Sequence, residues 1–260
     1  YGLVGSEMCI RDRYMKIFTR TLFIVMALMG LHVGANAQVD NTFRFVDQKT
    51  GNVIPDGGTY TAVAELIDKM PELPGLVVSL EAPFDIDVEN TTDDVAYVSA
   101  HVVSEELAGG KLQFCFPNQC PPTVPADYIS DNGTIAAGEK KGLQAEWTPV
   151  EGQYGTARFT VQLRTMEVTE WIEKGGIKLP SGYALKANGP KITINCIYAD
   201  PAGVDDVKAT GLTTYNVYDM TGRRVVENGT EADVQSLGKG LFVRETVIGG
   251  KRVSAEKIVR

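Results

Sequence analysis

The sequence predicts an all-β protein: an antiparallel β-sandwich of immunoglobulin or jelly-roll type, followed by a small C-terminal β-sandwich domain. Short runs of alternating apolar and polar residues, rich in Val, Ile, Thr and aromatic residues, recur along residues 38–198. Turn-forming Gly, Pro, Asn and Asp separate these runs. No long segment has the periodicity of an amphipathic helix. About nine short strands in this arrangement are typical of a sandwich.

The strands expected in this first domain are, in chain order, Thr42–Val46, Thr59–Leu66, Gly75–Leu80, Phe84–Val88, Val95–Val103, Lys111–Phe116, Leu143–Trp147, Ala157–Arg164 and Lys191–Tyr198. The segment Ala62–Met70 has a short helix as its alternative. The segment Thr169–Gly182 shows the period of neither a helix nor a strand, and its Pro180-Ser181-Gly182 indicates a loop.

The composition changes at Ala199–Gly211, which lacks aromatic residues and periodicity, so residues 199–212 are expected to be an interdomain linker. Residues 213–260 then form the C-terminal domain. Its expected strands are Thr213–Met220, Arg223–Val226, Leu241–Ile248 and Lys251–Val259, and Gly249-Gly250 is a two-residue hairpin turn.

The first 37 residues are expected to be absent from the mature protein. Residues 1–14 have no periodic pattern and resemble translated sequencing-adapter sequence, which makes Met15 the expected start. Residues 15–37 have the form of a signal peptide, with a basic start, the apolar run Thr21–Leu31 and an A-x-A site that places cleavage between Ala37 and Gln38. No later run is long and apolar enough to predict a transmembrane span once the signal is removed.

The charge and the sparse histidines exclude several classes of function. The 260 residues carry 25 basic and 33 acidic side chains, a net charge of −8, whereas nucleic-acid-binding proteins need a basic surface. Only His101 remains beyond residue 37, so a two-histidine metal site cannot form there, and neither G-x-S-x-G nor H-E-x-x-H occurs. We therefore expect a protein that is not an enzyme and binds no nucleic acid.

Three cysteines lie in the mature region. Cys115 and Cys120 flank a Pro-Asn turn, so we expect a disulfide between them in an exported protein. The alternatives, a redox pair or half of a metal site, are disfavoured by the C-x₄-C spacing and by the missing second ligand pair. Cys196 lies in an alternating run and is expected to be a buried thiol, with a Cys–His dyad to His101 as the catalytic alternative.

Carboxylates and tryptophans supply the remaining candidates. Asp85, Asp87 and Glu89 share one face of an expected strand, which suggests a Ca²⁺ site, and a solvated acidic face is the alternative. No other cofactor is expected. Trp147 belongs to an alternating run and is expected in the core, whereas Trp171 is expected to be exposed and able to face a ligand.

The C-terminal residues Val217-Tyr-Asp-Met-Thr-Gly-Arg-Arg-Val225, Leu237-Gly-Lys-Gly-Leu-Phe-Val243 and the final strand Lys251–Arg260 resemble the sorting domain of proteins exported by the type IX secretion system of Bacteroidetes. The resemblance implies a sorting motif that consists of Tyr218, Asp219, Gly222, Arg223 and Gly240. Two features depart from the pattern of such domains. The loop between Val226 and Leu237 is rich in Glu, and the polar pair Arg244-Glu245 interrupts a strand that is usually apolar. The segments Phe114–Cys120 and Leu143–Pro149 resemble small secreted β-sandwich proteins of the same bacteria.

The resemblance implies export by type IX-like secretion machinery, followed by removal of the tail and secretion or attachment to the outer-membrane surface. An unprocessed tail would leave the protein in the periplasm. The sequence thus predicts an exported non-catalytic β-sandwich that binds a glycan, a protein or a surface. The alternatives are a secreted hydrolase that uses the clustered carboxylates or Cys196, and a structural subunit of a surface layer or fimbria.

Overall fold

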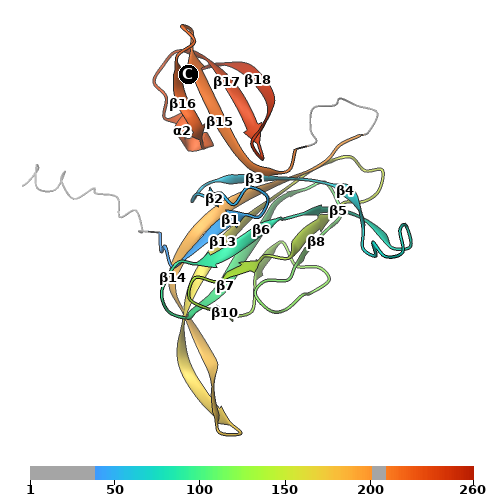
Figure 1. The fold of residues 1–260 in the computed structure, drawn as a ribbon, viewed down its shortest axis with the longest axis vertical. Helices are drawn as coiled ribbons and strands as arrows, with labels where there is room; N and C mark the ends of the chain where they lie inside the picture. Colours follow the sequence, from blue (N-terminus) through green and yellow to red (C-terminus); the bar gives the residue numbers. More distant parts are fainter. Residues whose placement is uncertain (1–38, 201–208) are drawn as a thin grey trace, which may run out of the picture. The chain divides into compact units, whose positions relative to one another are not determined.

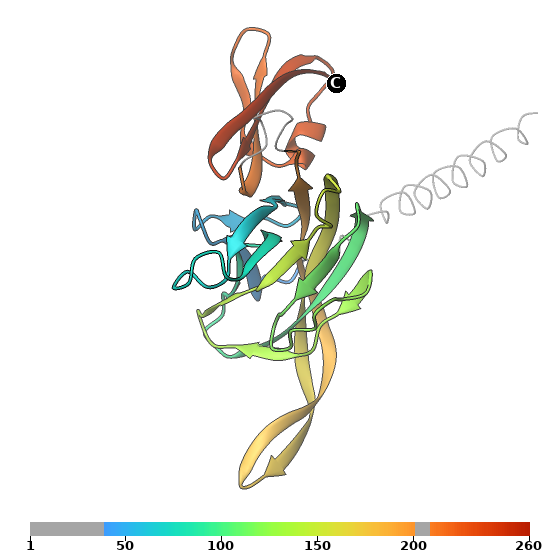
Figure 2. The same ribbon diagram turned by 90° about the vertical axis from the view of Figure 1, so that its right-hand side faces the viewer.

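The computed structural model describes residues 39–200 and 209–260, and their regular secondary structure is nearly all β-strand (Figures 1 and 2). The all-β sandwich predicted from the sequence is confirmed. The adapter-like segment, the signal peptide with Ala37 and Gln38, and residues 201–208 of the expected linker lie outside the described residues.

The strands form three sheets, with orders β11-β6-β1-β2, β4-β5-β12-β8 and β10-β7-β13-β14-β3-β15-β17-β18; β9 also pairs with β7, and β16 with β15. The elements are β1 (Phe43–Asp47), β2 (Val53–Ile54), β3 (Thr59–Val63), β4 (Glu65–Asp68), β5 (Val78–Pro83), β6 (Ile86–Asn90), β7 (Ala96–Leu107), β8 (Lys111–Phe114), β9 (Asp127–Ile129), β10 (Gly133–Ile135), β11 (Lys140–Gly142), β12 (Ala145–Thr148), β13 (Gly155–Lys174), β14 (Ile177–Tyr198), β15 (Gly211–Asp219), β16 (Arg224–Gly229), α2 (Glu231–Gln235), β17 (Leu241–Ile248) and β18 (Lys251–Val259).

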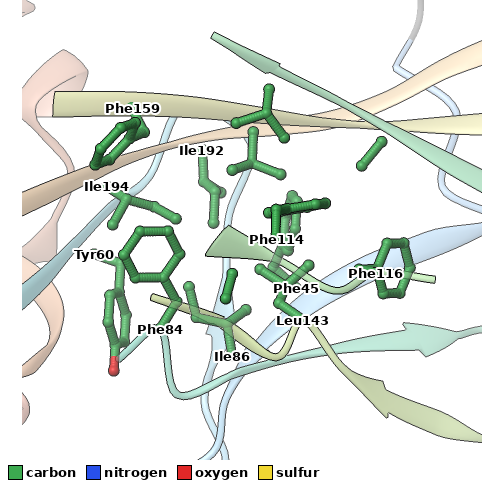
Figure 3. Close-up of a cluster of buried hydrophobic side chains, with 14 of the residues drawn as sticks. Phe45, Tyr60, Phe84, Ile86, Phe114, Phe116, Leu143, Phe159, Ile192 and Ile194 are labelled. Carbon is green, nitrogen blue, oxygen red and sulfur yellow. The ribbon is translucent and has the colours of Figure 1, made fainter. Parts of the chain in front are cut away.

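All three sheets contribute side chains to one hydrophobic core (Figure 3). The alternation read from the sequence turns one face of each strand inward, as in β6, where Ile86 and Val88 are buried and Asp87 and Glu89 are not. Aromatic rings dominate the packing, and Phe84 lies 5.9 Å from Phe159 between ring centroids. Each such side chain contributes about 1.5–3 kcal/mol by leaving water.

A helix over Ala62–Met70 is wrong. The run expected as one strand divides at Ala64 into β3 and β4, which belong to different sheets. Strand β3 pairs in parallel with β14, whereas β4 pairs antiparallel with β5. The chain therefore crosses between the layers of the sandwich at this point, which explains why the alternation is irregular there.

The C-terminal segment continues the ten-stranded sheet, because β15 pairs antiparallel with β3 through Gly211–Thr213. The β15 strand begins at Gly211, inside the linker expected over residues 199–212. Two polar contacts accompany the pairing. The buried carboxylate of Asp47 accepts a hydrogen bond from the Leu212 amide at 2.9 Å, and the hydroxyls of Thr61 and Thr213 lie 2.7 Å apart.

The loop expected between Val226 and Leu237 contains the helix α2. Thr230 and Asp233 form a reciprocal capping box at its first turn. Such a box supplies partners for backbone amides that a helix leaves free at its start. The Thr-x-x-Asp spacing was the available signal for this helix.

The two tryptophans provide a matched test of the core. Trp147 is fully buried and its indole N–H donates to the Gly109 carbonyl at 3.1 Å, whereas Trp171 is 46% exposed. Trp147→Ala should lower the free energy of unfolding by about 3–5 kcal/mol, because it opens a cavity. Trp171→Ala should change it by less than about 0.5 kcal/mol. Urea unfolding of both variants measures the difference, and equal effects would contradict the packing described here.

Candidate functional site

A two-stranded arm extends from the sandwich (Figures 1 and 2). It is formed by the second half of β13 and the first half of β14, which pair as far as Lys174 and Ile177. The pairing of β13 with β7 ends at Met166, and that of β14 with β3 begins at Thr193. Beyond these points, no third strand pairs with the arm among the described residues. At its base, the carbonyls of Asn188 and Lys191 still accept hydrogen bonds from the amides of Asp40 and Gly57.

The arm ends in a two-residue turn, Gly175-Gly176, in which both residues have positive φ, 61° and 77°. Positive φ at both central positions matches a type I′ turn, whose twist suits an antiparallel hairpin and which favours glycine. The sequence therefore fixes the tip of the arm locally.

Apolar side chains are exposed on both faces of the arm near this turn. Ile172 lies opposite Leu179, and Ile177 lies two residues from Leu179, so these three share one face. Their exposed fractions are 51%, 40% and 62%. Trp171 lies opposite Pro180 on the other face, with the Lys178 ammonium 5.5 Å from the centre of its ring. We refer to residues 171–180 as the arm tip.

The loop expected at Pro180-Ser181-Gly182, within the segment Thr169–Gly182, is wrong, whereas the exposure expected for Trp171 is confirmed. The register shifts between Val168 and Glu170 and again between Glu170 and Trp171, and these irregularities hide the alternation in the sequence. Pro180 is tolerated because a ribbon with open outer edges needs no amide hydrogen bond at every position. The Gly-Gly pair between two runs was the signal that could have identified the hairpin.

Each carboxylate of the acidic row, Asp85, Asp87 and Glu89, has a partner among neighbouring side chains. The Asp85 carboxylate pairs with the Lys49 ammonium at 2.9 Å, and the Asp87 carboxylate accepts a hydrogen bond from the side-chain amide of Gln48 at 2.7 Å. Glu89 accepts two hydrogen bonds from the Arg44 guanidinium at 3.0 and 2.8 Å, and this contact lowers the pKa of Glu89. Within residues 39–200 and 209–260, no three His, Cys, Asp or Glu side chains converge as a metal ion requires, so the structure gives the Ca²⁺ hypothesis no support.

The cysteines divide as expected. Cys115 and Cys120 form a disulfide, and Cys196 is a buried free thiol whose pKa is raised by burial. A buried thiol of raised pKa is a poor nucleophile, because the thiolate is the reactive form. His101 lies 2.8 Å from Asp127 and pairs with Gln162, whereas Cys196 pairs with Ala157. The structure therefore does not join His101 and Cys196 in a dyad.

The sorting-motif residues Tyr218, Asp219, Gly222 and Arg223 surround one turn after β15. The Asp219 carboxylate accepts hydrogen bonds from the backbone amides of Thr221 and Arg223, from the Thr221 hydroxyl and from the Arg223 guanidinium. Gly222 has a φ of +83°, which a residue with a side chain rarely adopts. The Tyr218 hydroxyl lies 3.4 Å from Glu245.

The fifth motif residue, Gly240, holds the end of the chain. Its amide donates to the Arg260 carbonyl, and the Arg260 amide donates back to the Gly240 carbonyl, both at 2.9 Å. A side chain at Gly240 would meet the Phe242 ring at 3.0 Å. The structure thus places four of the motif residues at one turn and the fifth opposite Arg260.

Arg244 and Glu245, which interrupt the apolar pattern of β17, are both paired. Arg244 contacts Glu231 and Glu256, and its guanidinium lies 5.1 Å from the centre of the Tyr215 ring. Glu245 pairs with Arg252 at 2.8 Å. The two residues lie on opposite faces of β17, and each is held by an ion pair with β18, Arg244 to Glu256 and Glu245 to Arg252.

Comparison with known proteins assigns no family to this chain. No family model and no curated protein matches the chain. Among solved structures, the chain is similar to the N-terminal domain of PorA, with 18% sequence identity and a TM-score of 0.40 over 60% of this chain and 96% of that one. A likeness at this level carries no functional argument. In the described part of the chain, we find no helix with the length and apolar character of a membrane span.

The hydrogen bonds to Asp219 predict a pH dependence. The hydrogen bonds that Asp219 accepts from Thr221 and Arg223 lower the pKa of its carboxyl to about 2, against about 3.9 for an unperturbed aspartate. A lowered folded-state pKa stabilises the turn above about pH 4, and this stabilisation is lost as the pH falls toward 2. Asp219→Asn should therefore speed exchange of the Thr221 and Arg223 amide hydrogens at pH 6, with the difference from wild type shrinking below pH 4. A difference that does not change with pH would contradict this role.

Proposed function

We propose that the protein is an exported, non-catalytic binding protein, secreted or attached to the outer-membrane surface. Its arm tip contacts the partner, and its C-terminal segment directs type IX-like secretion. One observation carries the binding part of this proposal. Four apolar side chains, Trp171, Ile172, Ile177 and Leu179, are 40–62% exposed at the end of a ribbon that no other described element covers.

Such a ribbon is costly to leave in water. An isolated two-stranded hairpin is marginally stable by itself, and large exposed apolar groups that lie together mark interaction sites. Tryptophan and branched aliphatic residues also lose less rotamer freedom on binding than Lys or Glu. A partner that covers the arm tip would both remove this apolar surface from water and hold the two strands together. A glycan, a protein and a cell surface all fit this description.

The non-catalytic part of the proposal rests on the state of the candidate catalytic groups. The three carboxylates of the acidic row each have a basic or amide partner, and the Cys196 thiol is buried. Neither arrangement favours the alternative of a hydrolase. The alternative of a structural subunit, in contrast, draws on the same exposed arm as the binding function.

The export part rests on the resemblance of the C-terminal residues to type IX sorting domains. The hydrogen bonds that Asp219 accepts give the motif a defined local structure, which a secretion machine would need to recognise.

Binding is tested with the arm tip. A double variant, Trp171→Ala with Ile172→Ser, should lose most of the binding of labelled protein to washed cells of the producing strain and to glycan arrays, because it removes apolar contacts from both faces. Val53→Ser is the matched control, since Val53 is 44% exposed and lies in β2. Undiminished binding by the arm variant would overturn the proposal, as would hydrolysis that a single carboxylate or Cys196 substitution abolishes.

Export is tested at the motif turn. Gly222→Val should strain the positive φ of this residue, and the protein should then accumulate in the periplasm instead of the medium or the outer-membrane fraction. Met220→Thr is the control, because Met220 lies in the same turn, has no positive φ and is 61% exposed. Immunoblots of the cell fractions measure the distribution. Normal export of the Gly222 variant would count against recognition of this turn.

A further inference from the structure

The molecule exposes a second group of apolar side chains, on the connection between β4 and β5. We call residues 66–78, which include the end of β4 and the first residue of β5, the β4–β5 loop; its exposed large apolar residues are Leu66, Leu73, Leu76, Val77 and Val78. Their exposed fractions run from 44% for Val77 to 73% for Leu66. This surface is comparable in character to the arm tip but belongs to a different sheet.

The β4–β5 loop is held in shape by its own polar groups. The Asp68 carboxylate accepts hydrogen bonds from the Met70 amide at 3.0 Å and from the Gly75 amide at 2.8 Å. The Lys69 amide donates to the Val77 carbonyl at 2.8 Å, and the Lys69 ammonium pairs with Glu81. The leucines are therefore displayed on an ordered loop, so little conformational entropy is lost when something covers them.

The two surfaces have opposite charge. The arm tip carries Glu173 against Lys174 and Lys178, a net charge of +1. The β4–β5 loop carries Asp68 and Glu72 against Lys69, a net charge of −1. The whole chain has a net charge of −8, so two copies repel each other over most of their surface. The arm tip facing the β4–β5 loop of another copy is a pairing that brings opposite charges together.

Figures 1 and 2 show the arm and the β4–β5 loop at separate places on the sandwich. A rigid sandwich cannot bring them together within one molecule, so contact between them requires two molecules. We propose that the arm tip of one copy docks on the β4–β5 loop of a second copy. Leu179, Ile172 and Ile177 meet the exposed leucines, and Lys174 and Lys178 lie near Glu72. This inference rests on the proposed function, since it names the partner of the same arm.

Contact between two different surfaces is heterologous. Each copy keeps one free arm and one free loop after pairing, so the association continues head to tail and yields a ring or an open filament. This outcome gives the binding protein the character of a structural subunit at the cell surface.

The experiment uses sedimentation velocity of the purified protein at rising concentration. The wild-type protein should increase in mass with concentration. Ile177→Glu on the arm and Leu76→Glu on the loop should each weaken association about thirtyfold, the change that corresponds to loss of a contact worth about 2 kcal/mol. Both residues are more than 60% exposed, so neither substitution should disturb folding. Val53→Glu, at an exposed position on neither surface, should associate like wild type.

Mixing the two defective variants decides the geometry. The Ile177→Glu variant keeps an intact loop, and the Leu76→Glu variant keeps an intact arm. An equimolar mixture should therefore form a one-to-one dimer that grows no further. A mixture that stays monomeric, or a Leu76→Glu variant that associates like wild type through its arms alone, overturns the inference.

The failure of this inference is distinguishable from failure of the proposed function. A wild-type protein that remains monomeric at every concentration, yet needs its arm tip to bind cells or glycans, removes self-association and leaves the binding function. Cell binding that is indifferent to the arm tip removes the binding function itself.

Discussion

The antiparallel pairing of β13 with β14 supports the rest of the structure. It runs from the pair Gly155–Tyr198 to the pair Lys174–Ile177 and therefore spans both the sandwich and the arm. Inside the sandwich, these strands carry Phe159, Val161 and Ile194 into the core, and their outer edges bind β7 and β3. Outside it, the same ladder is the whole framework of the arm. The rigidity of the buried half thus positions the exposed half.

Buried polar groups tie distant parts of the chain to this framework. Asp47 is fully buried and its carboxylate accepts from the amides of Lys49, Thr50 and Leu212, which joins the turn after β1 to the start of β15. Asn90 is also fully buried, and its side-chain amide donates to the carbonyls of Asp94, Ile135 and Ala136. An unpaired group at either place would cost several times what one hydrogen bond contributes.

The surface divides into paired charges and unpaired apolar groups, and this division indicates where function resides. The carboxylates of the acidic row and the charges of β17 have partners within the chain, so they serve the fold. The arm tip and the β4–β5 loop display apolar side chains on locally ordered hairpins. Exposed apolar groups on these hairpins fit the proposed binding by contact area better than they fit chemistry at one residue.

The sequence by itself determined the alternating strands, the buried Trp147 and Cys196, the exposed Trp171, the disulfide and the hairpin turn at Gly249-Gly250. These features depend on period, turn chemistry and local spacing, which neighbouring residues settle. Only the tertiary structure decided that the run over Thr59–Leu66 divides between two sheets, because sheet membership depends on partners far away in the chain. It also decided the partners of the acidic row, in which Asp85 and Glu89 pair with basic side chains and Asp87 with a glutamine side chain. Above all, it revealed the arm. Register shifts obscure the alternation of its residues, and its strands are positioned by long-range pairing inside the sandwich, which local sequence does not specify.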